Sequence, residues 1–259
     1  IKYFVYMFVG GALLLLGIAW IYAATGSLDI TALPNLMKSV DKASATGMAA
    51  LIFIGFGMKA AIFPFHSWLP DFHAEAPVPI HALLSAVLIK CGVYGILRIV
   101  YQAFPYFVGG LGNDFAKLIL LIAALITMIW GASMALVQIQ IKRILAYSSV
   151  NQIGYIMLGL SSGTSLGILG GLFHIITHGI AKGMLLLCAG SIIHQSHIRD
   201  VDKLGGLAKK MPLTAMATLI GGLSIAGFPP LAGFASEWMI FAGVLEAGYW
   251  PLALIGLLS

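Results

Sequence analysis

Charged residues are scarce in this chain. Only 9% of its 259 residues are Asp, Glu, Lys or Arg, whereas 60% are hydrophobic, and the mean hydropathy is +1.01. Soluble domains carry about 25% charged residues, so an ordinary soluble domain is excluded. The apolar runs are also far longer than the roughly 10-residue strands of outer-membrane barrels. The composition therefore predicts an all-α polytopic membrane protein.

Cysteine is also scarce, since Cys91 and Cys188 are the two in the chain and both lie in apolar runs. Two cysteines do not make an iron–sulfur cluster motif, and the chain has no G-x-G-x-x-G dinucleotide fingerprint. We therefore expect no cofactor in this chain. Basic patches with interleaved aromatic residues are missing as well, so nucleic acid is not an expected partner.

Long apolar stretches predict seven membrane spans and the start of an eighth. The first residue is Ile1 rather than Met, and the last residues continue an apolar run. We therefore expect the chain to be an internal piece of a longer protein. The expected spans cover about residues 3–24, 45–65, 78–101, 115–137, 144–160, 166–193 and 213–243, and the eighth begins near residue 250.

Proline interrupts two of these spans, at Pro64 and at Pro229-Pro230. Lys59 precedes the first interruption and Glu237 follows the second. Paired proline-broken segments in two halves of a chain are the best sequence pointer to the ion path of a transporter, although single proline kinks are common in membrane helices. We therefore expect two broken helices beside an ion path.

The loops differ in basic residues, and this difference predicts the orientation. The side that holds the N-terminus (the N-terminal side below) also holds the expected loops 65–77, 138–143 and 194–212. By the positive-inside rule this side is cytoplasmic, in a cell inner membrane. Its basic residues are Lys2, Lys142, Arg143, Arg199, Lys203, Lys209 and Lys210, against Lys38, Lys42, Arg98 and Lys117 on the other side.

Ionisable residues inside the expected spans are the candidate proton carriers, because such residues are costly in a bilayer. Lys90 lies about 12 residues into its span, which is about 18 Å from the start and near mid-membrane. A buried lysine can gain and lose a proton near neutral pH. Lys59 and Lys182 lie nearer to span ends, where lysines also extend to the interface without any further role.

His174, His178 and Lys182 are spaced i, i+4 and i+8, which puts them on one face of a helix. Titratable groups at this interval can pass protons through bridging water. Histidines in spans also serve as hydrogen-bonded packing residues. A haem protein is the alternative from another class, but axial ligands approach a haem from opposite faces, so two histidines on one face cannot both bind one haem.

Further polar residues are candidates for proton uptake or support: Lys142, His66 and Ser149. Lys142 opens the fifth span, where a positive-inside anchor explains it equally well. A metal site is not expected in the polar turn that precedes the third span, because the spacing of its residues matches no standard motif. The polar residues of that turn are His66, Asp71, His73, Glu75 and His81.

Four segments together resemble one family. They read KAAIFPFHSWLPDFHAEAPVPIHALLSAVLIKCGVYGILR at 59–98, IKRILAYSSVNQIGY at 141–155, FHIITHGIAKGMLLLCAGSI at 173–192 and GFPPLAGFASEW at 227–238. In this order they are similar to the antiporter-like membrane subunits of respiratory complex I, of multi-subunit cation/proton antiporters and of membrane-bound [NiFe] hydrogenases. The resemblance covers essentially the whole chain.

The resemblance implies a fourteen-helix fold with two inverted repeats, in which residues 1–259 form the proton-conducting core from helix six to the start of helix thirteen. Lys59 would then be the lysine of the first broken helix, and Lys90 the central lysine of helix eight. Glu237 takes a position that is lysine in some subunits and glutamate in others. The glutamate of helix five that pairs with the Lys59 position lies outside this chain.

The resemblance also implies a function: proton or cation/proton translocation by a non-catalytic membrane subunit of a redox-driven assembly. The expected partners are the lipid bilayer, other membrane subunits, and redox subunits with Fe–S or NiFe centres. The alternative is a multi-subunit sodium/proton antiporter without a redox partner. A purely structural scaffold would leave the ionisable residues inside the spans unexplained.

Overall fold

The computed structural model describes residues 1–104 and 114–257, without the side chains of residues 114–117. Lys117, one of the basic residues that the orientation rests on, therefore has its side chain outside the described part. The described residues form helices joined by short connections, plus one isolated antiparallel bridge between Gln140 and Asp200. The predicted all-α class is confirmed.

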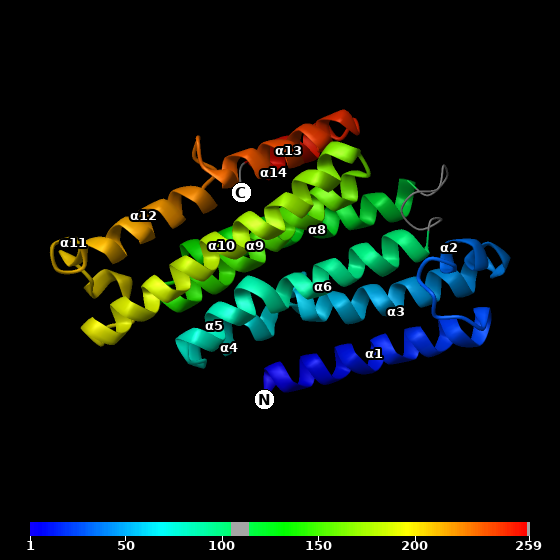
Figure 1. Ribbon diagram of the computed structural model, residues 1–259, viewed down its shortest axis with the longest axis horizontal. Helices are drawn as coiled ribbons and strands as arrows, with labels where there is room; N and C mark the ends of the chain where they lie inside the picture. Colours follow the sequence, from blue (N-terminus) through cyan, green and yellow to red (C-terminus); the bar gives the residue numbers. More distant parts are fainter. Residues whose placement is uncertain (105–113, 258–259) are drawn as a thin grey trace.

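The helices run roughly along one long axis (Figure 1). In the first half they are α1 (Lys2–Thr25), α2 (Leu33–Leu36), α3 (Lys42–Ala60), α4 (Trp68–Glu75), α5 (Val78–Leu83) and α6 (Ile89–Gly95). In the second half they are α8 (Asp114–Leu136), α9 (Ile141–Ser162), α10 (Ser165–Ser196), α11 (Leu207–Lys210), α12 (Pro212–Ile225), α13 (Ala232–Glu246) and α14 (Trp250–Leu257). Short 3₁₀ segments occupy Met37–Ser39, Phe65–Ser67 and Val201–Lys203, and π-helical segments occupy Leu84–Leu88 and Ile96–Tyr101 on either side of α6.

Five helical stretches of the described residues are long and apolar enough to cross a membrane. α9 has the length of a span, but its Ser, Asn and Gln residues make it less hydrophobic. The α12–α13 segment is divided by a break, and α14 has eight residues. The count of seven to eight spans therefore stays a prediction. The five stretches are Lys2–Thr25, Lys42–Glu75, Val78–Tyr101, Leu118–Leu136 and Ser165–Ser196.

Both predicted helix breaks are present. α3 ends at Ala60, Ala61 adopts a left-handed conformation with φ 55°, and helix resumes at Trp68. The second break separates α12 from α13 and contains Gly227 with φ 63°. At the first break the backbone N–H of Phe63 donates to Thr127 Oγ1 of α8 at 3.1 Å. A neighbouring helix thus satisfies a freed backbone group, as broken membrane helices require.

Residues 65–77 were expected to form a loop on the N-terminal side, and this expectation is wrong. Residues 68–75 form helix α4, which continues the broken helix towards that side and packs against α9. Trp68 and Leu69 are fully buried. Pro70 is compatible with the helix because it lies in its first turn, where a backbone N–H has no helical partner. The connection to α5 is reduced to Ala76 and Pro77.

A capped start fixes the approach to α3. Asp41 precedes the helix, and its Oδ2 accepts a hydrogen bond from the backbone N–H of Ser44 at 2.9 Å. This bond satisfies a free N–H of the first helical turn. It also holds the pKa of the Asp41 carboxyl below its usual range, because it stabilises the charged form.

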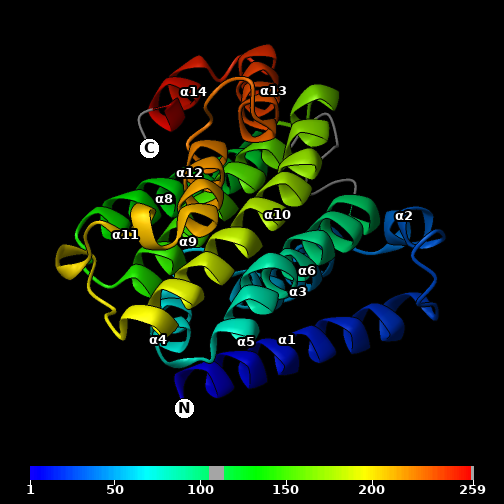
Figure 2. The same ribbon diagram turned by 60° about the vertical axis from the view of Figure 1, so that its left-hand side comes forward.

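Helix α9 lies at the centre of the bundle, in contact with α4, α8, α10 and α13 (Figure 2). Glycines permit close approach to α8: a Cβ on Gly131 would lie 2.4 Å from Asn151 N, and a Cβ on Gly154 would lie 2.6 Å from Met128 N. Small residues at membrane-helix contacts let the backbones come together in this way. The helix with the most polar buried face is therefore also the most enclosed one.

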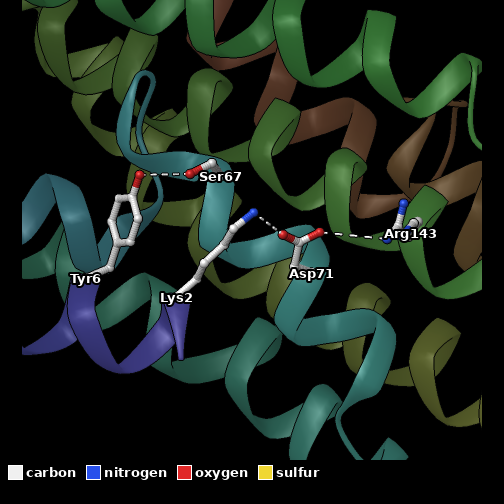
Figure 3. A network of polar contacts seen from close by, with 5 residues as sticks. All are labelled: Lys2, Tyr6, Ser67, Asp71 and Arg143. Atoms are coloured by element: carbon white, nitrogen blue, oxygen red, sulfur yellow. Dashed lines mark hydrogen bonds and ion pairs between the residues drawn. The ribbon is translucent and has the colours of Figure 1, made fainter.

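Ion pairs tie three helices together at the N-terminal side (Figure 3). Lys2 Nζ of α1 lies 2.6 Å from Asp71 Oδ2 of α4, and Arg143 Nη2 of α9 lies 3.7 Å from the other carboxylate oxygen. Tyr6 OH and Ser67 Oγ form a further hydrogen bond of 2.8 Å. The starts of α1 and α9 and the helix α4 thus share one end of the bundle, as the topology predicts.

We expect Gly131→Ala to destabilise the α8–α9 contact, because the added Cβ would overlap the backbone of Asn151. Overpacking of this kind costs about 1–3 kcal/mol, which lowers the melting temperature of the purified protein in detergent. Gly11→Ala in α1 is the matched control, since its Cβ would have no neighbour within 4 Å. Equal melting temperatures for the two variants would show that α8 and α9 do not pack closely.

Candidate functional site

A row of polar side chains, buried except for the half-buried Ser148 and Glu237, crosses the interior between α9, α10, α13 and the helix that α5, the first π segment and α6 form. α10 contributes three titratable groups, and the neighbouring elements contribute hydroxyl, amide and amino groups. We call this set the polar row. It comprises Ser85, Lys90, Ser148, Ser149, Gln152, His174, His178, Lys182, Ser236 and Glu237.

His174 joins three helices. Its side chain is 1% exposed, with Nδ1 2.8 Å from Ser236 Oγ of α13 and Nε2 2.5 Å from Gln152 Oε1 of α9. Because an amide oxygen can only accept, Nε2 carries the proton in this arrangement. Both ring nitrogens are therefore engaged by protein groups, which leaves neither to ligate a haem iron.

His178 lies one helical turn further along α10 and is 2% exposed. Its ring is nearly parallel to that of His174, with centroids 5.9 Å apart and an interplanar angle of 7°. Neither of its ring nitrogens has a hydrogen-bond partner among the described residues. Buried polar atoms are nearly always bonded to protein or water, so we expect water beside His178.

Lys182 completes the predicted face of α10 and is fully buried. Its Nζ donates a short hydrogen bond to Ser148 Oγ of α9. Gly179 and Gly183 flank this lysine, and a Cβ on Gly179 would lie 3.2 Å from Ala86 O of the first π segment. The spacing of His174, His178 and Lys182 therefore places all three on one buried face, as expected; their role in proton transfer stays a prediction.

Lys90 enters the row from α6 and is 5% exposed. Its Nζ donates a short hydrogen bond to the carbonyl oxygen of Ser85, and Ser85 Oγ lies 2.8 Å from Ser149 Oγ of α9. Its aliphatic part lines an apolar groove of about 620 Å³ between α6 and α10. The apolar stem thus faces the groove while the amine reaches the polar row.

The π-helical segment Leu84–Leu88 makes this contact available. In a regular α-helix, at about 100° per residue, Ser85 and Lys90 would point about 140° apart. A π-helical turn brings residues five apart into register, and such turns occur frequently at functional sites. The segment therefore turns the Lys90 amine towards the Ser85–Ser149 contact.

Glu237 lies at the far end of the row, in the second turn of α13. Its Oε1 has no hydrogen-bond partner among the described residues. The carboxylate borders a cavity of about 540 Å³ that Ser148, Asn151 and Gln152 of α9 also line. Because the residues of the second break line it too, the cavity connects the polar face of α9 with that break.

Lys59 occupies the last turn of α3 at the first break and is half-buried. In the described part of the chain its amine has no hydrogen bond or ion pair, so the structure does not join it directly to the polar row. Gly92 brings the two helices together, since a Cβ there would lie 2.8 Å from Ala60 N. The end of α3 that carries Lys59 therefore packs against α6 at Gly92, two residues after Lys90.

The candidates for proton uptake or support, Ser149, His66 and Lys142, lie in three different parts of the structure. Ser149 is fully buried within the row. His66 lies in the first break, where its Nε2 accepts a hydrogen bond from Trp130 Nε1 at 2.8 Å. Lys142 Nζ donates to the carbonyl oxygen of Ala76 at 2.8 Å.

The polar residues of 66–81 do not form a metal cluster. No group of three or more His, Cys, Asp or Glu that could hold a metal ion occurs among the residues that the structure places. His73 and His81 contact each other, His66 bonds to Trp130, and Asp71 is taken up by ion pairs at the surface. These residues are close along the chain, but their side chains take part in separate contacts.

Four members of the row, Ser85, Ser148, Gln152 and Ser236, are not among the site residues that the sequence predicts, and two of them show why. Ser85 lies five residues before Lys90, a spacing that favours contact only in a π-helix. Ser236 precedes Glu237, and single serines in apolar helices are too common to mark a site. The one signal for Ser236 is that it lies four residues after Ala232, in a helix that follows a proline break. This signal is weak.

We expect Gly227→Ala to displace the Glu237 carboxylate. A Cβ on Gly227 would lie 2.2 Å from Glu237 Oε2, and the positive φ adds about 1–2 kcal/mol of strain for any residue with a Cβ. A cryo-electron-microscopy map of the assembled complex would show the carboxylate turned away from Gly227. Gly222→Ala is the control, because its Cβ meets no atom within 4 Å; an unmoved Glu237 in the Gly227 variant would contradict the contact.

Comparison with known proteins agrees over the full chain. A family model described as NADH:quinone oxidoreductase/Mrp antiporter, TM, matches residues 1–259. NADH-quinone oxidoreductase subunit N of Desulforudis audaxviator is 39% identical over 259 residues, covering 98% of this chain and 51% of that protein. Hydrogenase-4 component B of Escherichia coli is 41% identical over 247 residues, covering 91% of this chain and 36% of that protein.

Solved structures give the same result. The Mrp complex from a Dietzia species matches with a TM-score of 0.91 at 31% identity, over 99% of this chain and 47% of that one. Respiratory complex I from Thermus thermophilus with bound NADH matches with a TM-score of 0.87 at 29% identity, over all of this chain and 54% of that one. The chain spans about half or less of these relatives. It belongs to the NADH:quinone oxidoreductase/Mrp antiporter family of transmembrane proteins.

Proposed function

We propose that this chain translocates protons across the membrane as part of a subunit of a redox-driven assembly of the complex I or membrane-bound hydrogenase type. The observation that carries the proposal is the polar row, which crosses an apolar interior. Lys90, Lys182, His174, His178 and Glu237 are its titratable members. Ionisable side chains that face the interior of a helix bundle mark proton and ion paths.

The surroundings of His174 suit a proton carrier. Ser236 Oγ lies 2.8 Å from His174 Nδ1 and 2.8 Å from the carbonyl oxygen of Gly233. With one proton on the ring, the serine hydroxyl donates to Nδ1. With two, Nδ1 donates to the serine oxygen and the hydroxyl turns to Gly233. The same heavy-atom arrangement therefore accommodates both protonation states.

The far end of the row supports a release step. Gln152 accepts from His174 on one side and borders the cavity beside Glu237 on the other. A proton on His174 therefore lies one amide away from a cavity large enough for several waters. In this proposal Glu237 receives the proton across the cavity, while Lys59 at the first break belongs to a second path that segments outside this chain complete.

The names of the curated relatives support a redox partner. They include subunits of NADH-quinone oxidoreductase, a component of hydrogenase-4 and a subunit of formate hydrogenlyase. These names favour the redox-driven proposal over a sodium/proton antiporter without a redox partner. The electron chemistry then belongs to partner subunits with Fe–S or NiFe centres, and other membrane subunits flank this one in the bilayer.

The orientation is part of the proposal. Lys2, Lys142 and Arg143 lie at the end of the bundle that we expect in the cytoplasm, and Asp71 binds two of them there. By the positive-inside rule this supports a cytoplasmic N-terminal side in a cell inner membrane. His66, Lys142 and Ser149 then support the path from that side.

We expect Lys90→Met to abolish proton translocation while the complex still assembles. Methionine keeps the apolar stem in the groove but removes the amine that contacts Ser85, so the row loses a carrier. Positioned proton-transfer groups contribute about a hundredfold or more in rate, and a loss of this size is expected. The measurement is dye-detected proton uptake into liposomes that hold the full parent complex.

Lys209→Met is the matched control, because Lys209 is exposed in α11 on the N-terminal side. It removes one positive charge at the surface and leaves the polar row intact. Normal uptake by both variants would exclude Lys90 as a carrier. Loss of uptake in both would trace the effect to surface charge rather than to the row.

A further inference from the structure

His73 and His81 form a buried pair that the polar row does not include. His73 lies in the last turn of α4 and His81 in the first turns of α5, on either side of the turn Ala76–Pro77. Their ring centroids are 3.9 Å apart at an interplanar angle of 86°, and the side chains are 0% and 1% exposed. Two imidazoles are thus held face to edge beneath a surface turn.

Three ring nitrogens of this pair are buried without a protein partner in the described part of the chain. Both nitrogens of His73 and Nε2 of His81 have no hydrogen-bond partner among the described residues. By contrast, both ring nitrogens of His174 are bonded to protein groups. Buried nitrogens without such partners require water, and water beside an imidazole can deliver or remove a proton.

The pair lies close to the surface on the N-terminal side. Glu75 and Pro77 beside it are exposed, whereas Ala76 between them is buried. Lys142 Nζ of α9 donates to the Ala76 carbonyl oxygen at 2.8 Å and so holds the turn in place. One turn of chain therefore separates the two imidazoles from the surface of the protein.

The way inward leads to the polar row. His81 and Ser85 are spaced i, i+4 and lie on the same side of the helix, about 6 Å apart along its axis. Ser85 contacts Ser149 through its hydroxyl and Lys90 through its carbonyl. The neighbouring Ser148 contacts Lys182. Ser85 of this helix and Ser148 and Ser149 of α9 thus lie between His81 and the two buried lysines of the row.

The groups that act electrostatically on the pair are histidine and lysine side chains, whereas the nearby carboxylate of Glu75 is exposed. The titratable groups that act electrostatically on His73 are His81 on α5, Lys182 on α10, Lys90 on α6 and Lys142 on α9. Those acting on His81 include Lys142 and Lys182, and no carboxylate is among them. Like charges repel in a low-dielectric interior. A protonated imidazole of the pair therefore gives its proton to a lysine that is neutral because it has already released a proton.

A metal ion fits this place less well than a proton. Structural zinc takes four protein ligands and catalytic zinc three. In the part of the chain that the structure places, the two imidazoles have no third His, Cys, Asp or Glu with them. The surrounding lysines would also repel a divalent cation.

We propose that His73 and His81 are the proton-loading pair of the polar row: they take protons at the Ala76–Pro77 turn and pass them through water, along the hydroxyl groups of Ser85, Ser149 and Ser148, to Lys90 and Lys182. The proposal rests on the proposed function, since it names the uptake site of the same path. Each step moves one proton from water to imidazole to amine, and no other reactant takes part.

The test compares His73→Gln, His81→Gln and the double variant in the full complex in liposomes, by proton uptake at several pH values on the N-terminal side. Without the pair the row loads directly from bulk water. We expect uptake at pH about 8 to fall about a hundredfold, and the deficit to shrink as the pH on that side is lowered. Changing the pH on the opposite side leaves the deficit unchanged.

His194→Gln is the matched control, because His194 is exposed in the last turn of α10. Uptake by the pair variants equal to that of His194→Gln at every pH would overturn the proposal. So would a deficit that does not respond to pH on the N-terminal side, which is the signature of a purely structural role. The Lys90→Met variant distinguishes a failure of the proposed function from a failure of the loading pair. If the complex with Lys90→Met translocates protons normally, the proposed function is wrong. If only the His73 and His81 variants behave like wild type, the proposed function stands and the loading pair is wrong.

Discussion

The hydrogen bonds of His174 are the interaction on which the rest of the site depends. They join α10 to Gln152 of α9 and to Ser236 of α13 in an apolar interior. In such an interior an unpaired polar group costs several kcal/mol, so these contacts fix the rotation of three helices about their axes. With α9 rotated this way, Ser148 and Ser149 one turn away face Lys182 and the first π segment. One bridging imidazole thus sets the register of the whole row.

The row is also enclosed, and glycine is the reason. A Cβ on Gly171 would lie 3.1 Å from Ile156 O, and one on Gly170 would lie 2.8 Å from Ile240 N. Together with the α8–α9 contacts, these positions bring helix backbones so close that no lipid separates them. Polar side chains on α9 and α10 therefore meet one another rather than hydrocarbon. This closeness is what allows a helix as polar as α9 to lie at the centre of a membrane bundle.

Features encoded along one helix could be predicted from the sequence, and features that depend on contacts between helices could not. The i, i+4, i+8 spacing placed His174, His178 and Lys182 on one buried face, and proline marked both breaks. The polar composition of residues 68–75 hid a helix whose buried side packs on α9. The contact of Lys90 with Ser85 depends on a π-helical turn, which a period of 3.6 residues does not reveal. The His73–His81 contact forms across a turn and is tertiary.

The distribution of charge explains how such a row can be driven. The ion pairs of the described residues lie at the surface, Lys2 and Arg143 with Asp71 and Lys203 with Asp200, whereas Lys59, Lys90 and Lys182 have none. Two unit charges about 8 Å apart interact by about 2 kcal/mol at an effective dielectric constant of about 20, which changes occupancy more than tenfold. A proton on one lysine therefore alters the occupancy of the next. A charge that a neighbouring segment brings to one end of the row accordingly changes proton occupancy along its length.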